Sequence, residues 1–124
     1  MPTYREVLAI NEQYALDNYK EDSGVKLLLL HFSKLSNADL LLAMDEQIPQ
    51  EIYDNFLFGV DKYVTQNIPV QHIIGFEYFY GHKFAVSKNV LIPRYETEEL
   101  VANVLMMYDE LFGGTDVEVL DLGT

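Results

Sequence analysis

The last four residues, Asp121-Leu122-Gly123-Thr124, form the pattern in this chain that could most directly hold a ligand. They follow apolar positions that are typical of a buried parallel strand entering a glycine turn. In α/β folds that bind nucleotides, such a turn lets the backbone approach the ligand, and it needs further glycines to do so. On its own the pattern is weak support for a ligand loop, and a plain structural turn is the alternative.

The sequence lacks the residues required for thiol chemistry and the histidine spacing typical of metal sites. The chain has no cysteine, which excludes disulfides, thiolate zinc sites, iron–sulfur clusters and cysteine nucleophiles within it. Its histidines are His31, His72 and His82, and no two of them are three or four residues apart on one helix. We therefore predict no metal site. Since His31 lies among leucines, we interpret it as a structural histidine of a helix.

The charge balance is strongly acidic. Eight basic and twenty acidic residues give a formal charge of −12. Because binding to a phosphate backbone depends on clustered Lys and Arg, this balance argues against direct contact with nucleic acid. No apolar run approaches the roughly 20 residues that cross a bilayer, and the N-terminus lacks the features of a secretory signal. We expect a cytoplasmic protein without membrane contact.

The first 68 residues have apolar side chains at helical spacing, which predicts a mainly α fold that begins with a small helical bundle. The first helix is expected from the capping-box pattern Thr3-x-x-Glu6 to about Tyr19. Asp22-Ser23-Gly24 is expected to end it and to cap a second helix over Val25–Phe32. The apolar positions expected on the first helix are Val7, Leu8, Ile10 and Tyr14.

Two further helices complete the expected bundle. One starts at the pattern Ser36-x-x-Asp39 and carries Leu40–Met44. The other has Pro49 in its first turn, where the missing N–H costs no hydrogen bond. Its apolar face consists of Tyr53, Phe56, Leu57, Val60 and Val64. A bundle this small needs nearly all of its large apolar residues inside, so we expect this face in the core.

From residue 69 onward the hydrophobic period changes. Residues 69–75 predict a single helical turn ended by a glycine. Two aromatic and β-branched runs, Phe76–Tyr80 and Lys83–Val86, flank Gly81-His82 and predict a β-hairpin that turns at this pair. Asn89–Pro93 is expected to be extended, because the residue before a proline disfavours the helical region.

The C-terminal residues predict one more helix and a strand. The helix is expected over Glu98–Phe112, with acidic residues in its first turn, where the helix dipole favours negative charge. Gly113-Gly114 ends it, and a strand is expected over Val117–Leu122. A buried strand without a parallel partner is incomplete, so we expect a piece of a longer protein. Its exposed apolar face and strand edge favour self-association or poor order.

Four stretches share the motifs of one family. They are Pro69–Gly75, Phe79-Tyr80-Gly81 with Phe84-x-Val86, Val90–Glu98 with the sequence L-I-P-R-x-E-T-E, and Val119–Thr124. Together they resemble the HemK/PrmC family of protein-(glutamine) methyltransferases, which modify peptide chain release factors. The resemblance covers the whole chain, and L-I-P-R-x-E-T-E is its most specific part. Tyr95 stands where family members usually have proline, a departure that loosens the turn.

The resemblance implies three parts: a helical release-factor docking domain at 1–68, a short helix and β-hairpin linker at 69–93, and the start of a truncated Rossmann-like methyltransferase domain at 94–124. Full-length members transfer a methyl group from S-adenosyl-L-methionine to the side-chain amide nitrogen of glutamine in a Gly-Gly-Gln loop. That nitrogen is a poor nucleophile, and in the family an Asn-Pro-Pro-Tyr motif positions it. This chain lacks the motif, so we expect no catalytic residue in it and no activity from it alone.

The match to the family also suggests site residues. Asp121, Gly123 and Thr124 match the start of the cofactor loop, although S-adenosyl-L-methionine is not expected to bind well to this chain alone. The docking domain is expected to contact a release factor through exposed residues, not through its core.

A second set of candidates lies just before the C-terminal helix. Arg94, Glu96, Thr97 and Glu98 match the family stretch beside the cofactor cleft, which makes them cofactor-side or substrate-side candidates. Structural roles are the alternative, with Thr97 as a helix cap and Glu98 and Glu99 as partners of the helix dipole.

Two other interpretations stay open. One is a stand-alone helical module that binds a protein, although such a module has no need of a hydrophobic strand leading into Asp-Leu-Gly-Thr. The other is part of another nucleotide-binding protein or amino-methyltransferase, including enzymes that act on nucleic acid. The charge of −12 disfavours nucleic-acid docking by this part of such an enzyme.

Overall fold

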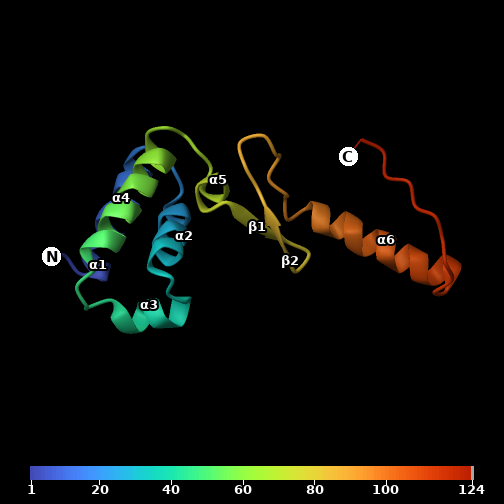
Figure 1. The fold of residues 1–124 in the computed structure, drawn as a ribbon, viewed down its shortest axis with the longest axis horizontal. Helices are drawn as coiled ribbons and strands as arrows, with labels where there is room; N and C mark the ends of the chain where they lie inside the picture. Colours follow the sequence, from blue (N-terminus) through green and yellow to red (C-terminus); the bar gives the residue numbers. More distant parts are fainter. Residues whose placement is uncertain (124) are drawn as a thin grey trace.

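The computed structural model describes residues 1–123 and is mainly helical, as predicted. Figure 1 shows a helical bundle at the N-terminal end, a β-hairpin in the middle, and one helix with an extended segment at the C-terminal end. Thr124 lies outside the described residues. Within residues 1–123, no helix is both long enough and apolar enough to span a bilayer.

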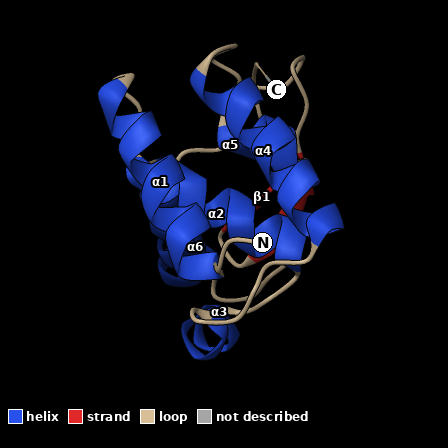
Figure 2. Cartoon of the chain, turned by 90° about the vertical axis from the view of Figure 1, so that its left-hand side faces the viewer, coloured by secondary structure: helices blue, strands red, loops and turns tan. Residues whose placement is uncertain are grey.

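Four helices form the bundle, namely α1 (Tyr4–Asp17), α2 (Asp22–Ser33), α3 (Asn37–Ala43) and α4 (Gln50–Val64). α2 packs against both α1 and α4, and α3 lies at one end of the bundle (Figure 2). Two predicted caps are confirmed. The Thr3 hydroxyl accepts a hydrogen bond from the Glu6 amide at 3.2 Å, and the Ser36 hydroxyl accepts one from the Asp39 amide at 3.1 Å. Each bond satisfies an amide that the first helical turn leaves free.

The core of the bundle draws on all four helices. Its largest fully buried side chains include Phe56, Leu28, Leu29, Leu40 and Ile48. On α4, Phe56, Val60 and Val64 are buried, while Tyr53 and Leu57 are half-buried against the core. The predicted apolar face of this helix is therefore confirmed.

The buried face of α1 confirms the prediction at Val7 and Leu8 and differs from it elsewhere. Its buried residues are Tyr4, Val7, Leu8, Asn11 and Ala15. Ile10 and Tyr14, which we expected in the core, expose 67% and 39% of their surface. The spacing 7, 8, 11, 15 follows one face of a helix with 3.6 residues per turn, and residues 10 and 14 lie beside that face. Asn11 is tolerated inside because its Nδ2 donates to the Val7 carbonyl at 2.8 Å.

The start of α2 also differs. It begins at Asp22, so Asp22-Ser23-Gly24 forms its first turn instead of breaking the chain. The chain reverses just before, where Tyr19 has a φ of 62°. Gly24 is needed in this turn because a Cβ there would lie 2.6 Å from the ring of Tyr63 on α4. The glycine therefore allows α2 and α4 to approach each other closely.

The predicted helical turn and hairpin are present after the bundle. α5 (Val70–Ile74) ends at a glycine, and β1 (Phe76–Phe79) pairs antiparallel with β2 (His82–Ala85). Phe79 lies opposite His82, so the turn is formed by Tyr80-Gly81, one residue earlier than predicted. Both residues have positive φ, 49° and 76°, as two-residue type I′ hairpin turns require.

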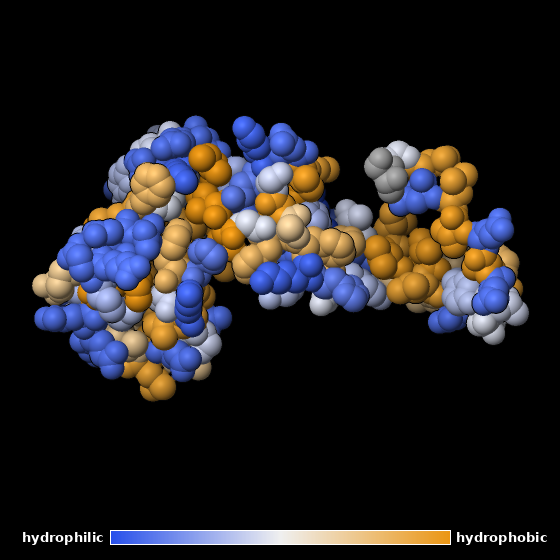
Figure 3. All heavy atoms as spheres, viewed as in Figure 1, coloured by the Kyte–Doolittle hydropathy of each residue, from blue (hydrophilic) through white to orange (hydrophobic). Residues whose placement is uncertain are grey.

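The C-terminal helix is confirmed and the C-terminal strand is not. α6 (Thr97–Phe112) buries none of its residues. Figure 3 shows apolar atoms gathered over α6 and the segment that follows it, so the predicted exposed apolar face is present. Val117–Leu122 forms no strand. In residues 1–123 the only sheet is the β1–β2 hairpin, so this segment has no neighbouring strand to satisfy its backbone groups.

Candidate functional site

A polar groove lies between α5, the start of β1 and the segment that precedes α6. Its volume is about 860 Å³, and its lining residues are Glu21, Pro69, Gln71, His72, Glu77 and Val90–Glu96. The groove therefore brings together two of the predicted site residues, Arg94 and Glu96. Both side chains are exposed to solvent and accessible to a ligand.

Hydrogen bonds hold the walls of this groove in place. Gln71 Nε2 donates to Glu77 Oε2 at 3.0 Å, and the Tyr78 amide donates to Glu77 Oε1 at 2.8 Å. On the other wall, His72 Nε2 lies 3.4 Å from the Val90 carbonyl oxygen. Both oxygens of Glu77 are therefore already engaged, so this carboxylate supports the groove. The sequence offered one signal of this role, a charged residue within an aromatic strand.

Arg94 is the residue of the groove best suited to binding. It takes no part in the one ion pair found in residues 1–123, which joins Arg5 and Asp45. A guanidinium has five donors in a fixed fork, which suits carboxylate, phosphate or carbonyl oxygens. Arg94 can therefore hold an anionic or carbonyl group in the groove, and Glu96 can accept from a donor.

The other two candidates of this stretch have structural positions. Thr97 is the first residue of α6, and no side chain caps this helix, so the predicted cap role of Thr97 is wrong. Tyr95 and Glu96 precede the helix without regular cap geometry, because Glu96 already has a helical φ of −60° and ψ of −31°. Glu98 faces the β-hairpin, where its Oε1 accepts a hydrogen bond from the Tyr80 amide at 2.7 Å.

Asp121 and Gly123 lie apart from the polar groove. Both belong to the extended segment after α6 and are exposed. Gly123 has a φ of 82°, which agrees with a glycine turn. Apart from its chain neighbours, no described atom lies within 4 Å of the position that a Cβ of Gly123 would occupy, so within residues 1–123 the structure shows no enclosed ligand site at this glycine. The third predicted member of this loop, Thr124, lies outside the described residues.

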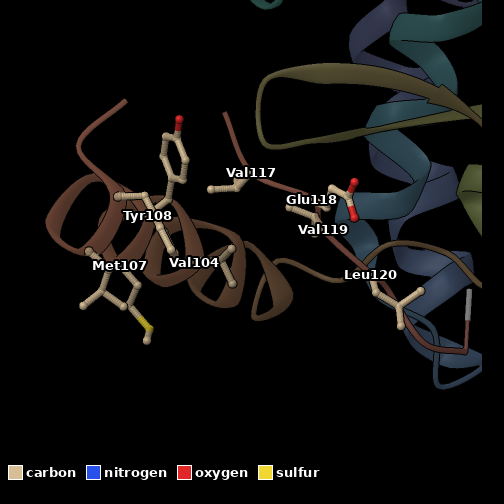
Figure 4. A pocket seen from close by; sticks show the side chains of 9 residues that line it. Val104, Met107, Tyr108, Val117, Glu118, Val119 and Leu120 are labelled. Carbon is tan, nitrogen blue, oxygen red and sulfur yellow. The ribbon is translucent and has the colours of Figure 1, made fainter. Parts of the chain in front are cut away.

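An apolar cavity of about 590 Å³ lies between α6 and the extended segment. Val104, Met107 and Tyr108 of α6 line it together with Val117–Leu120, as Figure 4 shows. The Tyr108 hydroxyl donates to the Thr115 carbonyl at 2.6 Å and holds the segment near the helix. With Glu118 as its one charged lining residue, the cavity offers apolar burial and no paired acid and base. Within residues 1–123 there is also no cluster of three potential metal ligands.

Comparison with known proteins identifies the family. The profile of the PrmC N-terminal domain matches residues 10–75. Release factor glutamine methyltransferases from Bacillus cereus and Bacillus subtilis are each 37% identical to this chain, over 96% and 100% of its length. The enzyme of that name from Neisseria gonorrhoeae is 37% identical over 80% of the chain.

The matches cover only part of each relative. This chain spans 42% of the Bacillus cereus protein, 43% of the Bacillus subtilis protein and 34% of the Neisseria gonorrhoeae protein. The profile match extends from within α1 through the bundle to the glycine that ends α5. This chain belongs to the PrmC N-terminal domain family.

Proposed function

We propose that this chain is the N-terminal part of a release factor glutamine methyltransferase that uses S-adenosyl-L-methionine. One observation carries the proposal: the relatives of that name align with nearly the whole chain, whereas the chain spans about two fifths of their length. The succession of bundle, hairpin and exposed amphipathic helix agrees with this assignment. The whole protein would transfer a methyl group to a glutamine side-chain nitrogen of a peptide chain release factor.

In this proposal the three parts of the chain have different tasks. Residues 1–68 dock the release factor, residues 69–93 link this domain to the next one, and residues 94–124 begin the methyltransferase domain. The exposed positions of Asp121 and Gly123 support the view that the chain alone binds S-adenosyl-L-methionine poorly and is inactive. A cytoplasmic location follows, because release factors act there. The charge of −12 disfavours direct contact with nucleic acid.

A chimeric enzyme tests the proposal. Residues 1–124 replace the aligned N-terminal part of the Bacillus subtilis relative, and methyl transfer from labelled S-adenosyl-L-methionine to a release factor is measured. We expect the chimera to be active and residues 1–124 alone to be inactive. A release factor with alanine in place of the acceptor glutamine serves as the control. Turnover by residues 1–124 alone, or an inactive chimera that is folded, would refute the proposal.

Docking is tested separately by release-factor capture. Immobilised residues 1–124 are expected to retain a release factor, and residues 1–68 are expected to do so as well. Capture by the longer chain only would place docking in the hairpin or in α6. If neither retains the factor, the bundle is not a docking domain.

We also propose that α6 and the segment after it mediate self-association when the rest of the protein is absent. Large apolar residues support this, since Leu100, Val104 and Leu111 expose 61%, 53% and 68% of their surface. Exposed apolar patches of this kind are typical of interfaces. The concentration dependence of sedimentation measures this self-association, and a chain that stays monomeric at all concentrations would contradict the proposal.

A further inference from the structure

α6 is attached to the turn of the β-hairpin by one hydrogen bond. The helix buries no residue, and within residues 1–123 this is the only hydrogen bond between α6 and residues that precede Arg94. That bond runs from the Tyr80 amide to Glu98 Oε1 and is 2.7 Å long. Its short length is typical of a charge-assisted hydrogen bond to a carboxylate.

The donor of this bond has no partner in the hairpin itself. The β1–β2 ladder ends at Phe79 and His82, so Tyr80 lies in the turn, where its amide points away from the strands. Glu98 satisfies this amide from the first turn of α6, where the helix dipole also favours a negative charge. The same carboxylate thus contacts the hairpin and stabilises the start of the helix.

The hydrogen bond between Tyr80 and Glu98 affects the groove because the segment that lines the groove leads directly into Glu98. The segment that lines the groove is held at Val90 by His72 and is held after Glu96 by the Glu98–Tyr80 bond. Arg94 and Glu96 lie between these two attachments. We propose that Glu98 is a positioning residue, whose carboxylate fixes α6 to the hairpin turn and thereby sets the place of Arg94 and Glu96.

The neighbouring residue provides a matched control. Glu99 lies in the same helical turn and carries the same charge, but it is exposed and makes no side-chain hydrogen bond within residues 1–123. Glu98→Ala removes the acceptor, Glu98→Gln keeps an acceptor oxygen without the charge, and Glu99→Ala removes only a dipole partner. Within residues 1–123 all buried side chains lie in residues 4–86, so the bundle core is unaffected by these changes.

Nuclear magnetic resonance of residues 1–124 tests this hydrogen bond through the chemical shift of the Tyr80 amide. In the wild-type chain we expect the Tyr80 amide resonance to shift as carboxylates titrate. The shift should persist in Glu99→Ala and be lost in both Glu98→Ala and Glu98→Gln. The proposal would be overturned if the Tyr80 amide resonance does not shift with pH in the wild type, or if it shifts equally in Glu98→Ala.

The position of α6 is measured by the distance between two spin labels, one on α6 and one outside it. The chain has no cysteine, so cysteines at Lys88 and Met106, both exposed, can be labelled selectively. The distance distribution is expected to broaden in Glu98→Ala, to remain narrow in Glu99→Ala, and to be largely restored in Glu98→Gln. Equal widths in all variants would show that Glu98 does not position the helix. Neither measurement involves methyl transfer, so both outcomes are independent of the proposed function.

Discussion

Tyr80 has a backbone conformation that its side chain disfavours. Its φ of 49° lies in the left-handed region, which costs about 1–2 kcal/mol for a residue other than glycine. Asparagine tolerates this region, and Asn-Gly is the preferred pair for such a hairpin turn. Tyr80 exposes 42% of its surface, so the loss of the burial of its ring offsets part of this gain. We predict that Tyr80→Asn stabilises the hairpin by about 1 kcal/mol, measured by amide exchange of β1 and β2.

The other residue of this turn, Gly81, provides a control whose replacement is expected to have the opposite effect. Gly81 has a φ of 76°, so Gly81→Ala is expected to destabilise the same strands. If Tyr80→Asn leaves amide exchange unchanged while Gly81→Ala accelerates it, the strain at Tyr80 is not a factor in hairpin stability.

Gly24 illustrates how packing can outweigh helix propensity. Alanine is the better helix former by about 1 kcal/mol. In this helix, however, its Cβ would lie 2.6 Å from the Tyr63 ring, whose hydroxyl is fixed by a 2.9 Å bond to the Glu21 carbonyl. We predict that Gly24→Ala destabilises the bundle by about 1–2 kcal/mol, the cost of overpacking reduced by the propensity gain.

Chemical denaturation followed by circular dichroism measures this change. Ser23→Ala, one position earlier and exposed, is the control and should leave the midpoint nearly unchanged. A stabilised Gly24→Ala variant would mean that Tyr63 moves aside at little cost and that the close approach of α2 and α4 is not required.

At the scale of elements, His31 couples the bundle to the hairpin. Its ring lies edge-on to Phe32 of α2 and to Phe76 of β1, with centroids 5.0 Å and 6.4 Å away. Burial lowers the pKa of His31, and the charges of Lys34 and Lys83 lower it further. The folded chain therefore binds this proton less readily than the unfolded chain, in which a histidine has a pKa of about 6.5.

The sign of the pH dependence follows from this pKa difference. Stability from neutral His31 is complete above the unfolded pKa and is lost as the pH falls through it toward the lower folded pKa. We predict that the midpoint of urea unfolding falls between about pH 7.5 and pH 5.5, and that it falls less in His31→Gln. The exposed His82→Gln should behave like the wild type. Identical pH dependence in His31→Gln and the wild type would contradict this role.

Elements were predictable where local signals agreed with packing. The Thr3 and Ser36 caps and the apolar face of α4 follow directly from residue spacing. The inner face of α1 was predicted only in part: Val7 and Leu8 are buried as expected, but Asn11 and Ala15 carry weak hydrophobic signals, whereas the exposed Ile10 and Tyr14 carry strong ones. Which side of a helix is buried depends on its neighbours, and spacing alone could not show that Asn11 would bond to the Val7 carbonyl.

The candidate site was only partly predictable for a similar reason. Motif resemblance indicated Arg94 and Glu96, which the structure places in one groove. It could not separate them from Glu98, because a difference of two residues at a helix start directs the side chain to another surface. The supporting pair Gln71 and Glu77 comes from α5 and β1 and is formed only when these elements meet.

For the whole molecule, the informative failure is the predicted strand at 117–122. Alternating apolar residues give a strand its buried faces, but a strand also needs a neighbour for its backbone hydrogen bonds. Within residues 1–123 no such neighbour exists, so the apolar side chains of this segment remain exposed beside α6. Leu120 and Leu122 each expose 82% of their surface. The hydrophobic pattern therefore predicted a strand that residues 1–123 do not form, because the pattern does not show whether a neighbouring strand is available.

The exposed apolar surface of α6 leads us to predict that residues 1–124 self-associate. Burial of apolar surface favours association, and Val104 and Leu111 line the cavity between α6 and the extended segment. We predict that residues 1–124 sediment with a concentration-dependent increase in mass and that Val104→Ser combined with Leu111→Ser shifts this dependence to higher concentration. The extended segment can supply either strand pairing or apolar contacts to the second copy.

A matched pair on the bundle shows whether association is specific to α6. Leu41 and Leu42 of α3 are as exposed, at 68% and 84%, but lie at the opposite end of the molecule (Figure 1). Replacing both by serine removes a similar apolar area and should leave sedimentation unchanged. If the α3 variant suppresses association as strongly as the α6 variant, the contact is nonspecific. The apolar face of α6 would then be only a surface left uncovered and not an interface.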